Sequence, residues 1–234
     1  MESALMAEEF ALGKILLFDK PLYWTSFDLV RKIKGILKNR LNLKKLKVGH
    51  AGTLDPLATG LMIVCTGKET KNIEKYQAEF KEYMAVIKLG ATTPSFDLET
   101  NVDVTYPTEH ITLADVERVL NGLKGTGMQK PPDYSARFIN GKRAYTLARK
   151  GEAVDLPMKE IEIRSIELIR FELPVIEFQV VCSKGTYVRS LARDIGNSLG
   201  SGAHLTGLIR TSIGSYLLKD AIKIEEFERN IVLL

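Results

Sequence analysis

One carboxylate in this chain stands in a setting that suits a nucleophile. Asp55 lies in the loop GHAGTLDPLATG, residues 49–60, among glycines and directly before Pro56. Proline restrains its own backbone and that of the preceding residue, while glycine permits tight turns and close approach by a ligand. An ionised aspartate held in this way could act as a nucleophile. A surface Asp-Pro turn is also common, and this loop alone leaves the two interpretations about even.

A block of positive charge precedes this loop and suits a polyanionic partner. Residues 31–47 hold eight basic side chains and no acid. They are Arg31, Lys32, Lys34, Lys38, Arg40, Lys44, Lys45 and Lys47. A short charged run is usually a solvated helix face, but that interpretation is weaker for a run without one acid, which suits a polyanion.

Metal and membrane chemistry are not expected. His50, His110 and His204 are scattered, and none has a ligand-like spacing from a cysteine. Cys65 and Cys182 lie in apolar stretches typical of buried, reduced thiols. No apolar run approaches the roughly 18 residues of a membrane helix. The N-terminal MESALMAEEFALG has acids where a signal peptide has bases, so a cytoplasmic location is expected.

The elements that must position the loop intersperse strands and helices. Expected strands cover 13–21, 61–66, 80–90, 159–171 and 175–183, and expected helices cover 27–38, 112–124, 143–150 and 187–199. The alternation within 80–90 places Tyr83 on the apolar face with Ala85 and Ile87. No repeat or clear linker divides the chain, so residues 1–234 are predicted to form one α+β domain.

Five segments carry recognisable motifs in a fixed order. They are DKP at 19–21, GHAGTLDPLATGLM at 49–62, KEYMAVIKLG at 81–90, PPDYSARFINGKRAYTLARKGE at 131–152 and CSKGTYVRSLARDIG at 182–196. Together they closely resemble the TruB family of pseudouridine synthases, which isomerise a uridine in the T loop of tRNA. The related large-subunit rRNA synthases usually show a shorter HRLD motif, which this chain lacks. The resemblance runs from about residue 13 to 216.

The resemblance implies a fold, a partner and a reaction. The fold is a mixed, mainly antiparallel sheet flanked by helices, with a central RNA-binding cleft. The partner is tRNA, through its T stem-loop; no protein partner, membrane or cofactor is implied. The enzyme would break the bond between base and sugar, rotate uracil, rejoin it through C5 and release the C5 proton. Whether the aspartate attacks sugar or base stays open, as does the base for C5, with Tyr83 a candidate.

The motif positions also imply a set of site residues. The catalytic positions of the family correspond to Asp55, Tyr83 and Arg189. Its contacts to the flipped-out nucleotide correspond to His50, Tyr187 and Lys20, the last near the entrance. Within the basic block, the RNA contacts expected nearest the loop are Lys44, Lys45 and Lys47.

Each implied role has a physical reason. An arginine beside an aspartate keeps it ionised and orients it through a forked hydrogen bond, which is the role implied for Arg189. An extruded uridine needs a flat surface, which the ring of Tyr83 supplies. Plainer alternatives exist. They are a surface position for Arg189, core packing for Tyr83 and Tyr187, a structural role for His50 and a solvated strand-end charge for Lys20.

Three departures from the family pattern stand out. KPxGxTS appears as KPLYWTS, with Tyr23 in place of glycine, which puts the local turn in question. TxTxDxxG appears as TTPSFDLET at 92–100, where Asp97 remains but proline enters and glycine is absent. Many relatives carry a further RNA-binding PUA domain after the catalytic region, and no separate one is expected here.

Two other functions compete with a pseudouridine synthase. A catalytically silent RNA-binding module on the same fold would need only the basic segment, and the set Asp55, Tyr83 and Arg189 argues against it. A glycoside hydrolase would need a second carboxylate across the scissile bond. No other acid in the sequence has framing comparable to that of Asp55.

Overall fold

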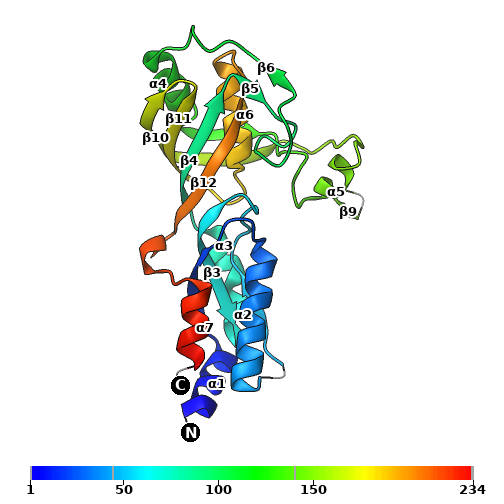
Figure 1. Ribbon diagram of the computed structural model, residues 1–234, viewed down its shortest axis with the longest axis vertical. Helices are drawn as coiled ribbons and strands as arrows, with labels where there is room; N and C mark the ends of the chain where they lie inside the picture. The colour runs from blue at the N-terminus through cyan, green and yellow to red at the C-terminus, as the bar shows by residue number, and fades with distance from the viewer. Residues whose placement is uncertain (1, 44, 140, 233–234) are drawn as a thin grey trace. The chain divides into compact units, whose positions relative to one another are not determined.

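The computed structural model describes residues 2–43, 45–139 and 141–232, and its contacts gather into two compact units (Figure 1). The first unit comprises residues 1–83 and 209–234, and the second comprises residues 84–208. The chain passes from one to the other within two strands, β4 (Lys81–Leu89) and β12 (Ala203–Ile213). The expectation of a single catalytic domain over 1–234 stays a prediction.

The first unit is built around β3, which is buried along almost its whole length. Its strands are β1 (Ile15–Lys20), β2 (Val48–His50), β3 (Thr59–Thr66), the last part of β12 and β13 (Tyr216–Leu217). β1 and β2 run antiparallel to β3, whereas β12 runs parallel to it. A strand with neighbours and helices around it must be apolar on both faces, which explains the uniform run LMIVCT.

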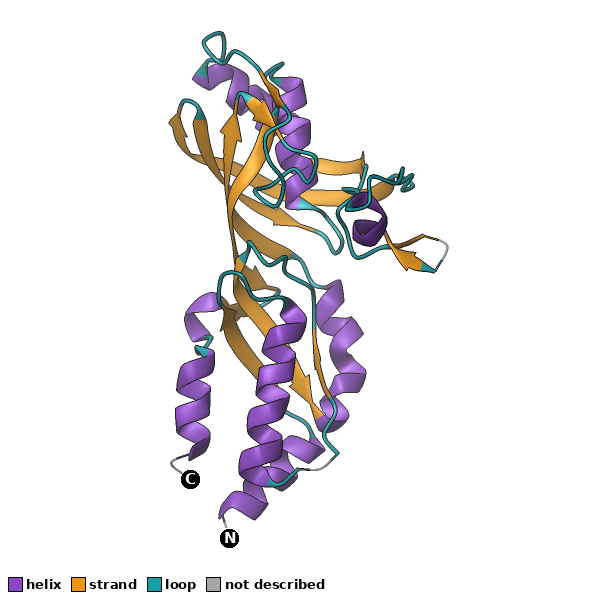
Figure 2. Ribbon diagram, turned by 45° about the vertical axis from the view of Figure 1, so that its right-hand side comes forward, coloured by secondary structure: helices purple, strands orange, loops and turns teal. Residues whose placement is uncertain are grey.

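Helices pack beside these strands. They are α1 (Glu2–Leu12), α2 (Ser26–Leu41), α3 (Ile73–Ala78) and α7 (Ile224–Val232), with 3₁₀ turns η1 (Gly67–Asn72) and η2 (Leu218–Asp220). Figures 1 and 2 show α2 and α7 side by side, and Lys32 pairs with Glu228 between them. Phe227 of α7 sets its ring edge-on against Phe18 of β1, with centroids 5.2 Å apart. These contacts fix α2, whose first residue, Ser26, bonds to Leu54 in the loop at 49–60.

In the part that the structure describes, the second unit holds antiparallel strands and three helices. Its main strands are β7 (Gly125–Gln129), β10 (Lys159–Glu172), β11 (Val175–Cys182) and most of β4. Two pairs of short strands are antiparallel: β5 (Ala91–Thr92) with β6 (Val104–Thr105), and β8 (Phe138–Ile139) with β9 (Lys142–Arg143). The helices are α4 (Leu113–Gly122), α5 (Ala144–Ala148) and α6 (Val188–Ser198). β10 pairs antiparallel with both β11 and β7.

The predicted fold class is confirmed: an α+β chain with a mixed, mostly antiparallel sheet flanked by helices. Cys65 and Cys182 are buried thiols, as predicted. Within the described ranges, no helix has the length and apolar character needed to cross a membrane. The same part of the chain holds no group of three or more acidic, histidine or cysteine side chains arranged for a metal ion.

Candidate active site

The loop that carries Asp55 is fixed by neighbours on both sides. The Ser26 hydroxyl donates to the carbonyl of Leu54 at 3.0 Å and accepts from the Leu54 amide at 2.8 Å. The Asp55 carbonyl accepts from the Ala58 amide at 3.1 Å. The next carbonyl, that of Pro56, accepts from the Tyr23 amide at 2.8 Å. The start of α2 therefore holds the backbone around Asp55 in one conformation.

Two buried cations lie on either side of Gly60, in the strands that flank β3. Lys20 pairs with Gly60 across β1 and β3, and Gly60 pairs with Arg210 across β3 and β12. Lys20 and Arg210 are both essentially inaccessible to solvent. Gly60 has φ +104°, and a Cβ there would lie 2.4 Å from the carbonyl oxygen of Arg210. Glycine is thus required for the close approach of these strands.

Arg210 donates hydrogen bonds to backbone carbonyl groups of the Asp55 loop and of β3. Its Nε donates to Leu61 at 2.7 Å, and its terminal nitrogens donate to Gly52 at 3.1 Å and Thr53 at 3.4 Å. A planar guanidinium is suited to several acceptors at once, which lysine is not. Arg210 is absent from the predicted site. Its only signal in the sequence is one base within the stretch AHLTGLIRTSI, which forms a strand.

Replacing Arg210 with methionine is expected to destabilise the protein by roughly 3 kcal/mol, because buried carbonyls lose their donor. Chemical denaturation followed by circular dichroism measures this loss. Arg118→Met is the matched control, since Arg118 is 76% exposed and pairs only at the surface with Asp115. Its change should stay within about 0.5 kcal/mol. Equal losses in the two variants would contradict the role assigned to Arg210.

Lys20 is a buried charge, so its interpretation as a solvated strand-end residue is wrong. Its Nζ donates to the carbonyls of Pro21 at 2.8 Å and Trp24 at 2.6 Å. Burial lowers the pKa of Lys20 to about 8, the negative charge of Asp55 opposes this shift, and the charge of Arg210 adds to it. At neutral pH Lys20 therefore remains mostly cationic and supplies positive potential at Asp55. A role in binding substrate stays a prediction for a side chain this enclosed.

His50 ends β2 at the start of the same loop. It lies opposite Val64 of β3 and is half-buried. Burial lowers the pKa of His50, and the positive charge of Arg210 lowers it further. The imidazole is therefore neutral at physiological pH and offers both a donor and an acceptor. This suits a hydrogen bond to a base or sugar better than a charge pair with phosphate.

Tyr83 occupies the predicted face of β4. Tyr83, Ala85, Ile87 and Leu89 are all buried, while the residues between them are more exposed, so the predicted alternation is confirmed. Tyr83 itself is 8% exposed. The burial fits core packing as well as a stacking surface for a base, so the catalytic role of Tyr83 stays a prediction.

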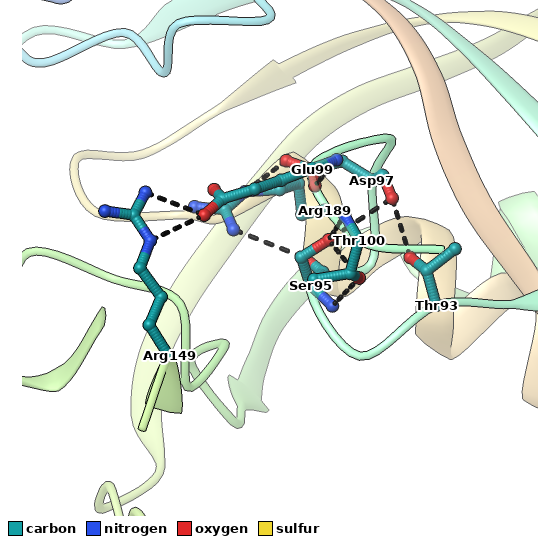
Figure 3. Close-up of polar contacts among 7 residues, drawn as sticks. All are labelled: Thr93, Ser95, Asp97, Glu99, Thr100, Arg149 and Arg189. Atoms are coloured by element: carbon teal, nitrogen blue, oxygen red, sulfur yellow. Dashed lines mark hydrogen bonds and ion pairs between the residues drawn. The ribbon is translucent and has the colours of Figure 1, made fainter. Parts of the chain in front are cut away.

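Arg189 is buried in the second unit, so its interpretation as a surface helix residue is wrong. It is 4% exposed and lies in the first turn of α6. Its Nε lies 3.6 Å from Oδ2 of Asp97, and one terminal nitrogen donates to the carbonyl of Ser95 at 3.2 Å (Figure 3). A buried guanidinium needs such partners to offset its desolvation. Asp97 therefore helps to fix the orientation of Arg189.

The altered segment at 92–100 builds a hydrogen-bonded loop around Asp97. Ser95 and Thr100 exchange hydrogen bonds through their hydroxyls and amides, and the Thr93 hydroxyl donates to the carbonyl of Asp97 at 2.7 Å (Figure 3). Phe96 takes a positive φ of 63° within the turn. Side-chain hydroxyls hold this loop, and its carboxylate sits at Arg189. The loss of the family's glycine therefore leaves Asp97 in a defined place.

Tyr187 precedes α6 as its N-cap residue and is half-buried. The side chain of Gln129 brackets it: Oε1 accepts from the Tyr187 amide at 2.8 Å, and Nε2 donates to the Tyr187 carbonyl at 3.2 Å. Gln129 is almost fully buried. Sequence patterns do not single it out, because one glutamine before two prolines has no motif of its own. It ties the end of β7 to the helix that carries Arg189.

The predicted residues thus gather in two groups. Lys20, His50 and Asp55 lie around Arg210 in the first unit, and Tyr187 and Arg189 lie at the start of α6 in the second. Pairing of Arg189 with Asp55 stays a prediction. Of the predicted RNA contacts, Lys45 and Lys47 are exposed, and Lys44 lies outside the described residues.

Comparison with known proteins places this arrangement in a family. The protein-family model described as TruB family pseudouridylate synthase (N terminal domain) matches residues 38–188. The tRNA pseudouridylate synthase B C-terminal domain matches residues 189–234. The chain belongs to the TruB family. These matches cover both groups of site residues apart from Lys20.

Curated relatives in the TruB family match nearly the whole chain. The tRNA pseudouridine synthase B of Parabacteroides distasonis is 58% identical over 228 residues, covering 96% of this chain and 97% of the relative. That of Flavobacterium johnsoniae is 51% identical over 225 residues, covering 96% and 98%. A chain in the crystal structure of a Cbf5–Nop10–Gar1 complex has a TM-score of 0.69 at 26% identity. The match covers 95% of this chain and 55% of that longer one.

Proposed function

We propose that this TruB-family chain isomerises uridine to pseudouridine in the T loop of tRNA, with Asp55 as the nucleophile. The observation that carries the proposal is the setting of Asp55. Its loop is held by Ser26 and Arg210, and the charge of buried Lys20 lies close enough to interact with the carboxylate. The names of the relatives, tRNA pseudouridine synthase B, support the substrate. The cytoplasm is the proposed location.

The chain's own groups suit the steps of this reaction. Asp55 adds to the uridine, the bond between N1 and C1′ breaks, and uracil rotates. A bond between C5 and C1′ then forms, and the bond between Asp55 and the nucleotide breaks, which regenerates the carboxylate. The C5 proton then leaves and N1 gains a proton, so substrate and product are isomers and no cofactor is consumed. Tyr83 is the proposed surface and candidate base, and Arg189, oriented by Asp97, is the proposed partner that keeps Asp55 ionised.

Mapping pseudouridine in a tRNA transcript incubated with the protein tests the proposal. We expect one modified uridine in the T loop, and no product at that position when it is changed to cytidine. Unmodified RNA would overturn the activity, and a product confined to another stem would overturn the T-loop assignment. RNA bound without any product would favour the silent RNA-binding module.

The basic segment at 31–47 is the proposed path of the RNA backbone. Of its basic side chains that the structure describes, six are exposed. They are Arg31, Lys34, Lys38, Arg40, Lys45 and Lys47. Lys32 instead pairs with Glu228, and Arg31 pairs with Asp28. Positive side chains that displace condensed counterions give binding a salt dependence proportional to the number of phosphates contacted.

Changing Lys44, Lys45 and Lys47 together to alanine is expected to weaken tRNA binding. The slope of log Kd against log salt concentration should also fall by up to about three. Filter binding between low and moderate salt measures both quantities. A matched control removes three exposed lysines elsewhere in the first unit, Lys68, Lys71 and Lys75. If the two triple variants behave alike, residues 44–47 form no specific path for RNA.

A further inference from the structure

Tyr23 combines an unfavourable backbone with an exposed ring. Its φ is +67°, in the left-handed region that disfavours bulky side chains. The TruB pattern has glycine at this position, which would adopt the same turn without strain. The side chain is nevertheless 75% exposed, so burial of the ring does not offset the strain. Strained residues that bring no packing gain concentrate at functional sites.

The ring of Tyr23 borders a pocket of about 450 Å³ in the first unit. The pocket lining is Tyr23, Trp24, Asp28, Arg31 and Lys32. Its volume lies within the range of small-molecule sites, roughly 300–1,000 Å³. Aromatic side chains from the turn before α2 form one part of the lining, and charged side chains from the first turns of α2 form the other.

Hydrogen bonds hold the charged side chains Asp28 and Arg31 of the pocket. Asp28 accepts from the amide and hydroxyl of Thr25 at 3.0 and 2.6 Å as the capping box of α2. Its other oxygen accepts from Arg31 at 2.7 Å. These bonds orient the guanidinium at the pocket. Since Arg31 is exposed, a phosphate would find an oriented donor there without displacing a buried group.

The pocket is coupled to the catalytic loop and to the basic face of α2. The Tyr23 amide donates to the carbonyl of Pro56 at 2.8 Å, directly after Asp55. Arg31, Lys34 and Lys38 follow one another at helical spacings of three and four, so they share a face of α2, and all three are exposed. The hydrogen bond to Pro56 places the Tyr23 backbone beside the Asp55 loop, and Arg31, the first residue of this basic face, also lines the pocket.

We propose that this pocket is a second nucleotide subsite, in which an unpaired base of the RNA stacks on Tyr23 while a phosphate beside it contacts Arg31. The inference rests on RNA being the substrate, as proposed above. An aromatic ring beside oriented positive charge is the chemistry that single-stranded nucleotides require. The energetic cost of Tyr23 in the free protein is then offset when RNA binds.

A Tyr23→Gly variant separates this role from a structural one through the free energy of unfolding. A structural role for Tyr23 predicts that the substitution lowers it. Removing the strain should leave the free energy of unfolding unchanged or raise it. Losing the stacking surface should raise the Kd for a tRNA transcript by about 5- to 100-fold. Tyr23→Phe should keep tight binding, and Tyr23→Asn, which tolerates a positive φ but has no ring, should bind like the glycine variant.

Trp24 gives a direct readout, because it lines the pocket and is the only tryptophan in the chain. Its fluorescence should change on titration with the tRNA transcript, and Tyr23→Gly should shift the midpoint to higher RNA concentration. A Kd for Tyr23→Gly equal to that of the unaltered protein would overturn the subsite and leave the pocket to another class of partner, such as a protein. Failure of the proposed function is separate: it would appear as absence of pseudouridine in the unaltered protein.

Discussion

Asp55→Asn is expected to abolish pseudouridine formation, with a loss of about 10⁴-fold or more, as for removal of an enzyme nucleophile. Asparagine preserves the size of the side chain but has neither the charge nor the nucleophilicity of a carboxylate. The hydrogen bonds that fix this loop involve the backbone of Leu54, Asp55 and Pro56, so they should survive the change. Single-turnover assays with excess enzyme measure the rate of the chemical step directly.

Two controls make the Asp55→Asn result interpretable. The melting temperature and the Kd for tRNA should stay near those of the unaltered protein, because the substitution leaves the RNA path and the core intact. Asp155→Asn removes one negative charge from an exposed position in the other unit and should retain full activity. A near-native rate for Asp55→Asn would remove Asp55 from the role of nucleophile.

The sequence predicts the Asp55 loop well because its signal is local. Glycine, aspartate and proline determine the turn through their own backbone preferences, and the apolar run that follows is long enough to identify β3. The position of Tyr83 on the buried face follows from the alternation of β4 in the same way. Both inferences need only neighbours in sequence.

The partners of these residues are harder to predict from the sequence, because they come from distant segments. Arg210 reaches Gly52 and Thr53 across more than 150 positions, and Gln129 reaches Tyr187 across 58. The strand that carries Arg210 has an irregular alternation of buried and exposed positions, so no expected element covers it. Its role appears only once the pairing of Arg210 with Gly60 is known.

Burial of charge is the point at which reasoning from residue type fails. Lys20 and Arg189 each look like surface residues, since lysine and arginine are rarely buried. In the structure each is enclosed and its charge is matched by carbonyls or a carboxylate, Pro21 and Trp24 for Lys20 and Asp97 for Arg189. Only the resemblance to TruB motifs assigns these two cations to the predicted site.

Arg189→Lys is expected to lower the single-turnover rate by about 100-fold or more, on the scale of a lost charge-stabilising contact. The guanidinium bonds Ser95 with one nitrogen and lies beside Asp97 with another. Lysine keeps the charge but has a single ammonium group on a flexible chain, so it cannot hold both partners and still present a planar fork. The orientation of the cation should be lost while its sign remains.

Comparing the rate at saturating tRNA with the Kd distinguishes a loss of orientation from a loss of folding. A positioning role predicts a lower rate at saturating tRNA with little change in Kd, whereas a damaged fold would weaken both. Arg193→Lys is the matched control, because Arg193 lies one turn further along α6 and bonds Lys130 and Asp194 nearer the surface. It should cost far less than Arg189→Lys.

Asp97→Asn completes the argument, since it alters the partner of Arg189 without touching Arg189 itself. If Asp97 acts only by orienting the guanidinium, its substitution should slow the reaction, but should add little to the loss in Arg189→Lys, because the oriented pair is already broken. Independent, additive losses would mean that Asp97 acts by a separate route. An unchanged rate in Arg189→Lys would show that the charge alone suffices and that the ion pair with Asp97 serves the stability of α6 rather than catalysis.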